Sequence, residues 1–459
     1  MTSSAPVIVV GGGISGLVCA YALRKAGVDA ELLEASPRAG GVIGSERRNE
    51  FLLELGPQSF SGTAALRALC AELGITDQLV QAPASAPRYV LIDGALRAVP
   101  LNLAAILTSS LFSVRTKWRI ARDAFGTTRP PEEDESIATF VRRKFGEELL
   151  DRLMGPFVSG IYAGDPERLS LRSAFPQLHE AEKSAGSVIR GMRRAAKAHE
   201  GPRERPTLLG FRGGNETLVQ ALAGKIGSRL RLEAEVVGIG VRREAGAVKF
   251  EMRIRKAGSE QILFAERLVL ATPADVAGAL LRDVNPAFEP VLGGIEYAPV
   301  AVVSLGYRRE DVGHSLEGFG FLAPRSSGLR VLGSVWNSSL FPGRAPAGRV
   351  LLTNFVGGAT DPSAAMLSAE DLAELVHREI APVLQIRGAA AFSHVQTYRR
   401  ALPQYNIGHE ERLKALDRLR GELPGLFFVG NYLRGPAIGN CVELGIAAAE
   451  GLVSEAKST

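Results

Sequence analysis

The chain has 459 residues, of which 46% are hydrophobic and 22% charged. This length allows two or three domains with large cores, and this balance argues against disorder. The net charge of +5 is too small to predict nucleic-acid binding, but it suits an acidic small molecule or an anionic membrane surface. The scattered Cys19, Cys70 and Cys441 form no disulfide or zinc pattern, which indicates a reducing compartment and no metal site.

The first segments of the chain predict a strand, a glycine turn, a helix and a second strand. Val7–Val10 is a β-branched run typical of a buried parallel strand. A helix over residues 17–25 follows the glycines and stops at Gly27, and residues 31–33 form the next strand. Because residues 1–6 lack a positive region followed by an apolar one, we expect no secretory signal and a cytoplasmic location.

The middle of the chain is predicted to be mostly helical, from residue 101 to about 205. No apolar run in it reaches the ~18–20 residues of a membrane span. Residues 101–125 place four cations beside apolar side chains, so they form either a helix pair of a substrate domain or a segment resting on the inner face of a membrane. The cations are Arg115, Lys117, Arg119 and Arg122.

The last third returns to strands and turns. Strands are predicted at Leu268–Leu270, Tyr297–Arg308, 318–322 and 426–429, and an apolar helix over 442–453. The final strand ends at Gly430, just as the first strand ends at Gly11. Both strand ends therefore carry the kind of turn at which a ligand approaches the backbone.

The glycine turn has the GxGxxG spacing, with Gly11 for the tight turn, Gly13 for backbone approach to a pyrophosphate and Gly16 for close helix packing. The helix after it offers free N–H groups to the phosphates. Glu34 ends the second strand, 18 positions beyond Gly16, where a carboxylate accepts from the ribose hydroxyls. The alternative, a glycine turn before an ordinary helix, leaves Glu34 unexplained.

Several separate stretches converge on the predicted ligand, which favours a long, buried cofactor such as FAD over a nicotinamide that leaves in each cycle. They are the Arg38 to Gly41 loop, the turn from Gly56 to Ser59, and the Gly430 turn. The predicted fold is therefore α/β: a Rossmann-like FAD-binding domain, a mixed-sheet substrate domain and a helical, membrane-associating subdomain. We expect FAD-binding parts at 1–85, 206–275 and 391–459, a substrate domain at 86–100 and 276–390, and the helical subdomain at 101–205.

The runs GGGISGL, EASPRAGG and LGPQSF resemble the flavin-containing amine-oxidase superfamily. The resemblance implies that Arg38, Gly40 and Gly41 contact FAD and that Val236 lies near the adenine. The full set expected to bind FAD, non-covalently, is Gly11, Gly12, Gly13, Ile14, Ser15, Gly16, Glu34, Ala35, Arg38, Gly40, Gly41, Val42, Gly56, Pro57, Gln58, Ser59, Val236, Ala271, Thr272, Gly430, Asn431, Ala437 and Ile438.

Longer motifs resemble the protoporphyrinogen-oxidase family, at residues 159–166, 318–322, 340–344, 402–409 and 430–435. The resemblance implies oxidation of protoporphyrinogen IX to protoporphyrin IX by successive hydride transfers to flavin, with molecular oxygen as acceptor. It implies that Arg88 pairs with a propionate, where the alternative is a solvated arginine on a strand. It also implies that Leu322 and Phe341 hold the macrocycle, and that Gly160 and Gly164 let backbone approach, where the alternatives are core packing and an ordinary turn.

No side chain is assigned as the catalytic base. Tyr162, Tyr405 and His409 are candidates, but flavin N5 takes the hydride and pyrrole tautomerism releases the proton, so the protein mainly positions the ring. A coproporphyrinogen III oxidase is the nearest alternative, followed by an amine oxidase or carotenoid desaturase and by a non-catalytic flavoprotein. Beyond substrate and oxygen, the resemblance leaves open a homodimer, peripheral membrane contact and transfer of product to a chelatase.

Overall fold

The structure, a computed structural model, describes residues 6–100, 102–198, 207–244, 247–256 and 258–458. Five parallel strands form the sheet β10-β2-β1-β14-β20. β1 (Val7–Val10) is buried throughout and pairs with β2 (Ala30–Leu33) and β14 (Leu268–Leu270), as apolar runs covered on both faces require. The predicted strands at 7–10 and 268–270 are confirmed, and β10 (Leu230–Arg231) and β20 (Leu426–Phe428) lie at the edges.

Both faces of the parallel sheet are covered. On one face α1 (Ile14–Lys25) and α17 (Ile438–Ser458) pack so closely that a Cβ on Gly445 would lie 2.7 Å from the carbonyl oxygen of Ser15. The same layer holds α2 (Ala64–Leu73), α11 (Glu216–Ile226), the 3₁₀ turns Thr76–Gln78 and Gly227–Arg229, and a small sheet of β5 (Phe60–Ser61), β9 (Leu208–Phe211) and β6 (Leu79–Gln81). The opposite face packs on β11 (Glu235–Glu244), β12 (Ala247–Lys256), β13 (Ser259–Ala265), α12 (Ala274–Leu280), α13 (Phe288–Gly293) and α16 (His409–Gly421).

A second, seven-stranded sheet has the order β19-β15-β18-β17-β16-β7-β8. Its neighbours are antiparallel except β16 and β7, which are parallel. One face packs on α15 (Ala369–Leu384) through an apolar core. The strands are β7 (Arg88–Ile92), β8 (Ala95–Ala98), β15 (Tyr297–Arg308), β16 (Gly320–Leu322), β17 (Val331–Val335), β18 (Arg349–Gly357) and β19 (Phe392–Pro403). This part also contains the hairpin of β3 (Ser45–Arg48) and β4 (Phe51–Glu54), helix α14 (Asn337–Leu340), and the 3₁₀ turns Arg309–Asp311, Arg325–Ser327 and Ala364–Met366.

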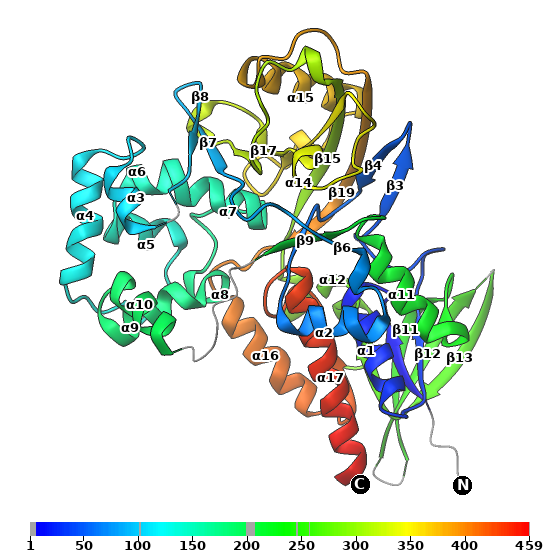
Figure 1. The fold of residues 1–459 in the computed structure, drawn as a ribbon. Coiled ribbons are helices and arrows are strands. Elements are labelled where there is room, and N and C mark those ends of the chain that lie inside the picture. The colour runs from blue at the N-terminus through cyan, green and yellow to red at the C-terminus, as the bar shows by residue number, and fades with distance from the viewer. Residues whose placement is uncertain (1–5, 101, 199–206, 245–246, 257, 459) are drawn as a thin grey trace.

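Residues 103–198 form a separate body of helices, here called the helical lobe (Figure 1). Its core is apolar, and serine or asparagine caps several helix starts, as Ser113 does for α4 and Ser136 for α5. The mostly helical segment predicted at 101–205 is confirmed within the described residues. The elements are α3 (Leu103–Thr108), α4 (Val114–Phe125), α5 (Ile137–Lys144), α6 (Glu147–Leu149), the π-helical turn Leu150–Met154, α7 (Gly155–Tyr162), α8 (Leu171–Ala174), α9 (Pro176–Ala185) and α10 (Val188–Ala198).

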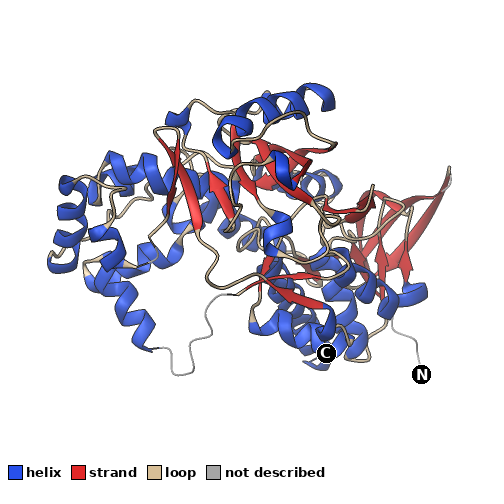
Figure 2. Cartoon of the chain, turned by 45° about the horizontal axis from the view of Figure 1, so that its top comes forward, coloured by secondary structure: helices blue, strands red, loops and turns tan. Residues whose placement is uncertain are grey.

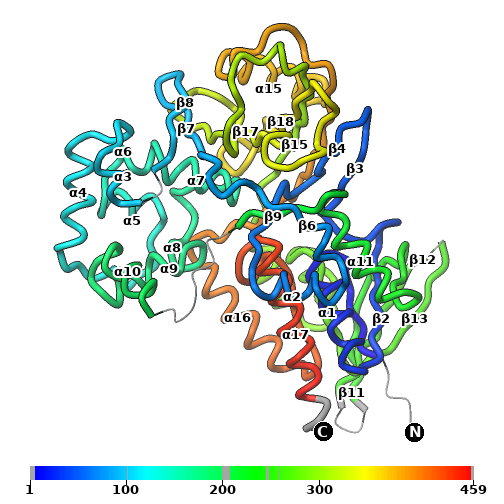
Figure 3. The backbone as a smooth tube through the Cα atoms, viewed as in Figure 1, coloured from blue at the N-terminus to red at the C-terminus, as the bar shows by residue number. Residues whose placement is uncertain are grey.

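The chain passes between these bodies several times. In Figure 2 the helical lobe lies to one side of the strands, and in Figure 3 the chain runs from β6 through β7 and β8 into the lobe before it returns at β9. β19 lies within the stretch 391–459 assigned to the FAD-binding domain, yet it pairs with β15 of the seven-stranded sheet. Conversely, α13 lies within 276–390 but covers the parallel sheet. The packing therefore assigns β19 and α13 to other parts of the molecule than the expected boundaries do.

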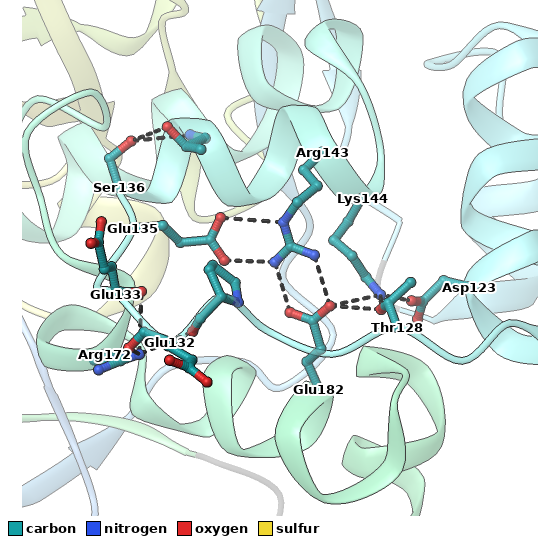
Figure 4. A network of polar contacts seen from close by, with 12 residues as sticks. Asp123, Thr128, Glu132, Glu133, Glu135, Ser136, Arg143, Lys144, Arg172 and Glu182 are labelled. Atoms are coloured by element: carbon teal, nitrogen blue, oxygen red, sulfur yellow. Dashed lines mark hydrogen bonds and ion pairs between the residues drawn. The ribbon is translucent and has the colours of Figure 1, made fainter.

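A buried ion network joins the helices of the lobe (Figure 4). Lys144 of α5 contacts Asp123 of α4 at 2.5 Å and Glu182 of α9 at 3.2 Å. Arg143 bridges Glu182 at 2.8 Å and Glu135 at 2.6 Å. Since Lys144, Asp123 and Glu182 are almost fully buried, their charges are compensated within the lobe, as buried ions must be.

Candidate FAD and substrate site

The glycine turn between β1 and α1 leaves no room for side chains at two positions. A Cβ on Gly11, whose φ is +108°, would lie 2.7 Å from the Ala271 carbonyl oxygen, and one on Gly16 would lie 2.0 Å from the Gly11 carbonyl oxygen. At Gly13 a Cβ would meet nothing within 4 Å. The turn is therefore closed toward the sheet and open outside Gly13, which leaves the space that the predicted pyrophosphate needs.

Glu34 follows β2 and points back at this turn. Its carboxylate accepts from the Gly12 backbone N–H at 2.6 Å and from the Ser36 backbone N–H at 2.8 Å. The neighbouring Ala35 lies in the same turn, and the Ala234 N–H donates to the Glu34 carbonyl at 2.9 Å, which brings Val236 into the core beside this strand end. The structure therefore brings the predicted ribose and adenine residues together.

The second predicted loop lies directly against the first. The Gly40 N–H donates to the Gly12 carbonyl at 2.7 Å, and Gly40 and Gly41 both have positive φ, at +110° and +58°. The Arg38 guanidinium donates to the carbonyls of Ile43 at 3.0 Å and Gly41 at 2.7 Å. Arg38 therefore holds the loop through its backbone.

The turn at 56–59 is brought to the same place. A Cβ on Gly56 would lie 2.2 Å from the Val42 carbonyl oxygen, so only glycine permits this approach. The Pro57 carbonyl accepts from Asn215 at 2.8 Å, and Gln58 accepts from the buried Asn337 at 2.7 Å. Ser59 follows them directly before β5, half-buried.

The Gly430 loop comes from β20, at the edge of the parallel sheet. Gly430 follows β20, whose neighbour β14 leads into Ala271 and Thr272, and the Val429 N–H donates to the Leu270 carbonyl at 3.0 Å. The loop from Gly430 continues through Asn431 and Ala437 to Ile438 at the start of α17. All predicted cofactor segments thus meet at the carboxyl ends of the parallel strands.

The arrangement fits a dinucleotide with flavin. Helix α1 has no side-chain cap and no acidic residue in its first turn, so its first N–H groups are available to a phosphate. The Thr272 hydroxyl is buried and has no partner among the described residues. The phosphates, ribose and ring system of FAD would be held by four segments: residues 11–16, which include Ile14 and Ser15, then Glu34, the Gly40 loop and the Gly430 loop.

One face of the seven-stranded sheet reaches these loops at the Val42 carbonyl, and we call it the sheet face. In-register pairs place Val90, Leu322, Gly333, Phe355 and Val302 in one row across β7, β16, β17, β18 and β15. Arg88, two residues before Val90, shares the face, as does Tyr398 two residues beyond the partner of Val302. Tyr398 reaches the Val42 carbonyl at 3.5 Å, which connects the sheet face to the cofactor loops.

The predicted substrate residues do not all lie on the sheet face. A Cβ on Gly160 of α7 would lie 2.8 Å from Leu322, so these two are in contact across the lobe and the sheet face. Gly164 packs instead on Leu169 and Gln404. Arg88 is exposed at the start of β7, with its guanidinium 5.5 Å from the Phe319 ring centre, and has no ion pair among the described residues.

Phe341 lies outside the strands of the sheet, but it belongs to the same apolar cluster as Val335, which is two residues beyond Gly333 on the sheet face. Its ring is only 1% exposed, packs in a cluster with Phe319 and Leu340, and lies 5.5 Å under the Arg344 guanidinium. Phe355, which the sequence did not single out, lies in the same row as Leu322, with Gly333 between them, and is half-buried. Apolar core and pocket residues look alike in sequence, so only strand register distinguishes them.

Tyr162, Tyr405 and His409 form a buried stack rather than a catalytic group. The rings of Tyr405 and His409 lie 4.4 Å apart at 10°, and Tyr162 packs 5.6 Å from Tyr405. Burial lowers the pKa of His409 to about 4 and raises the pKa of Tyr162 to about 12. At neutral pH these groups are uncharged and fixed, and none of them has the pKa of a general base.

Two surface grooves lie elsewhere among the described residues. One is lined by Pro131, Arg172 and His179 beside α9, the other by Asp93 and Asp151 beside α15 and β7. Neither contains a predicted site residue, and both are open to solvent with mixed charges. Both grooves therefore lie apart from the predicted cofactor and substrate residues.

Comparison with known proteins agrees with this geometry. Residues 14–453 match the model of the family described as flavin containing amine oxidoreductase. Protoporphyrinogen oxidase 1, chloroplastic, of Arabidopsis thaliana is 35% identical and covers 96% of this chain and 87% of its own. Coproporphyrinogen III oxidase of Bacillus subtilis is 30% identical and covers 96% of both chains.

Solved structures agree on the fold. A protein from Exiguobacterium sp. 255-15, provisionally named a protoporphyrinogen oxidase, has a TM-score of 0.82 at 25% identity, and covers 99% of this chain and 100% of its own. Reduced UDP-galactopyranose mutase has a TM-score of 0.75 at 16% identity, covering 98% and 96%, which is a likeness of fold alone. The match over nearly the whole length places the chain in one family: it belongs to the flavin containing amine oxidoreductases.

Proposed function

We propose that the chain is an FAD-dependent oxidase that converts protoporphyrinogen IX to protoporphyrin IX, with molecular oxygen as the acceptor. The observation that carries the proposal is the sheet face, which contacts Gly160 of the helical lobe through Leu322 and the Val42 loop through Tyr398. A porphyrinogen is a puckered, apolar macrocycle, and such a substrate requires an apolar wall opposite the flavin loops. The relatives named for porphyrinogen oxidation support this choice of substrate class.

The residues of this chain would mainly position the substrate. When bound, FAD would supply a hydride acceptor that molecular oxygen reoxidises. Leu322 and Phe355 would pack against the macrocycle, and the Arg88 guanidinium would pair with a propionate at the open end of β7. Because Tyr162 donates its hydroxyl to the Ala174 carbonyl at 2.9 Å, it is not available to take a proton, and release of the pyrrole proton needs no side chain.

The test of this function is an aerobic fluorescence assay with protoporphyrinogen IX and coproporphyrinogen III as separate substrates. Wild type should be yellow, release FAD on denaturation and form protoporphyrin faster than coproporphyrin. Faster turnover of coproporphyrinogen would favour the coproporphyrin-forming alternative, which the Bacillus subtilis relative supports. A colourless protein that takes up no FAD would refute both.

Arg88→Ala should raise KM by about tenfold or more and change kcat little, because a charge-assisted bidentate pair contributes roughly 1.5–3 kcal/mol of binding. The control is Arg349→Ala, since Arg349 is also exposed and also begins a strand of the same sheet, and this change should leave KM unaltered. Equal kinetics for Arg88→Ala and wild type would remove Arg88 from the site.

The proposal includes peripheral contact of α4 with an anionic membrane surface. Val114, Trp118 and Phe125 are 82%, 59% and 87% exposed on one side of α4, which lies at the outer edge of the lobe (Figure 1). Arg115 and Arg122 flank them, and Arg122 lies 5.1 Å from the Trp118 ring centre. No helix within the described residues is long and apolar enough to span a bilayer.

Vesicle sedimentation tests this contact. Wild type should bind phosphatidylglycerol vesicles more than phosphatidylcholine vesicles, and Trp118→Glu should lose most of that binding. Ile262→Glu is the control, because Ile262 is 53% exposed on β13, far from α4. Equal recovery of both variants with the vesicles would contradict the contact. A homodimer and transfer of product to a chelatase stay predictions from the resemblance.

A further inference from the structure

Tyr405 lies between β19 and α16 and is fixed in the helical lobe. Its side chain is 1% exposed, and its ring packs between Tyr162 and His409. Its backbone carbonyl accepts from the Ser170 N–H at 2.8 Å, and the adjacent Asn406 bridges to Leu169. The lobe therefore holds one side of the Tyr405 ring through Tyr162, and α16 holds the other through His409.

The Tyr405 hydroxyl points out of the lobe toward a different part of the chain. It accepts a hydrogen bond from the Gly435 N–H at 2.6 Å and donates to the Asn431 carbonyl. Both groups belong to the loop between β20 and α17. Burial raises the pKa of Tyr405 well above its usual value, so the hydroxyl keeps the proton that it donates.

This loop carries the cofactor residues Gly430, Asn431, Ala437 and Ile438 at the carboxyl end of the parallel sheet. A shift of the Asn431 to Gly435 backbone would move the surface offered to the flavin. Gly435 has φ of +106°, which few residues other than glycine adopt, so the turn requires glycine at this position. The Tyr405 hydroxyl bonds to it on both sides.

We infer that Tyr405 is a positioning residue. It holds the 431–435 loop at a fixed place relative to Tyr162 of the helical lobe, and through the loop it holds bound FAD. It acts through the loop backbone. The inference rests on FAD binding and not on the identity of the porphyrinogen. Its test uses cofactor binding alone, so it fails or succeeds independently of the proposed substrate.

Tyr432 offers a matched control within the same loop. Its side chain is 0% exposed, and its hydroxyl has no hydrogen-bond partner among the described residues. Tyr405→Phe therefore removes two hydrogen bonds to the loop, whereas Tyr432→Phe removes none. Tyr162→Phe is a second control, because the hydroxyl of Tyr162 bonds only within the lobe, to the Ala174 carbonyl.

The experiment measures FAD affinity of the three apoproteins by flavin fluorescence, the flavin absorbance spectrum after reconstitution, and the melting temperature with and without FAD. Tyr405→Phe should weaken FAD binding by about tenfold or more, shift the flavin bands and reduce the gain in melting temperature that FAD gives. Tyr432→Phe should match wild type in all three. Tyr162→Phe should lower the melting temperature with and without FAD by the same amount.

An equal loss of melting temperature in both forms of Tyr405→Phe, with unchanged FAD affinity and spectrum, would overturn the inference and leave a structural role. If the variant does not fold, hydrogen exchange on the wild-type protein replaces it. The Gly435 amide should be protected from exchange with and without FAD. Rapid exchange of this amide in the FAD-bound protein would also overturn the inference.

Discussion

At the residue scale, Gly13 and Gly16 belong to one turn but have opposite surroundings. Around Gly16 the Gly11 carbonyl and the Ala271 side chain fill the space that a Cβ would need. Around Gly13 that space is empty, and its φ of −67° suits any residue. Packing in the protein itself therefore requires glycine at position 16, whereas it leaves the space beside Gly13 open.

This difference predicts two separable defects. Gly16→Ala should destabilise the apoprotein by at least ~2 kcal/mol, because α1 must shift away from the Gly11 carbonyl. Gly13→Ala should change apoprotein stability by no more than about 1 kcal/mol but weaken FAD binding by over ~tenfold, since its methyl group occupies the phosphate position. Urea unfolding of the apoproteins and flavin fluorescence titration measure the two effects. Normal FAD affinity in Gly13→Ala would contradict the placement of the pyrophosphate.

Some of the site could be predicted from sequence because its geometry is local. The spacing of Gly11, Gly16 and Glu34 fixes a turn, a helix and a strand end, and the structure places them together. The contact of Gly160 with Leu322 depends on docking of the lobe on the sheet, which no local pattern encodes. Phe355 was missed for the same reason, since its position follows only from strand register.

At the element scale, the helical lobe depends on charges as well as on its apolar core. Burial favours the neutral form of Glu182, but hydrogen bonds from Arg143 and Thr128 outweigh it and lower its pKa to about 2. Because this folded-state pKa lies below the ordinary value of a glutamate, the carboxylate stabilises the lobe above about pH 4.5. That stabilisation is lost as pH falls from about 4.5 to 2.

Glu182→Gln should therefore lower the free energy of unfolding at pH 7.5 by about 2 kcal/mol or more and flatten its dependence on pH below 4.5. Urea unfolding followed by circular dichroism at pH 7.5, 4 and 3 measures both. Glu180→Gln is the control on the same helix, because Glu180 is 63% exposed and only loosely paired with Lys183 at 3.8 Å. A Glu182 variant as sensitive to acid as wild type would show that the network does not control acid stability.

At the scale of the whole molecule, one fully buried ion pair joins the β3–β4 hairpin to the segment between α14 and β18. Glu54 of β4 contacts Arg344 at 2.6 Å, with the two side chains 1% and 0% exposed. Glu54 also accepts from the Asn215 N–H at 3.0 Å and the Ser45 hydroxyl at 2.6 Å. The partners are 290 positions apart, so sequence patterns could not reveal the pair.

Arg344→Met should destabilise the protein by about 3–5 kcal/mol, because it leaves Glu54 buried without its cation. Adding Glu54→Leu should recover part of that loss, since the double variant buries no unpaired charge. Thermal and urea unfolding of single and double variants measure the coupling. Arg349→Met should stay within about 0.5 kcal/mol of wild type, because Arg349 is exposed. No recovery in the double variant would show that the charge pair is not the source of the loss.

The parallel sheet draws its strands from both extremes of the chain, with β1 at residues 7–10 and β20 at 426–428. During synthesis the parallel sheet around β1 therefore stays incomplete until β20 has left the ribosome. Such distant pairing is slow and leaves apolar strand edges open to wrong partners. We therefore expect cofactor capture to come late in the maturation of this protein, and production in cells short of chaperones should lower the yield of folded protein.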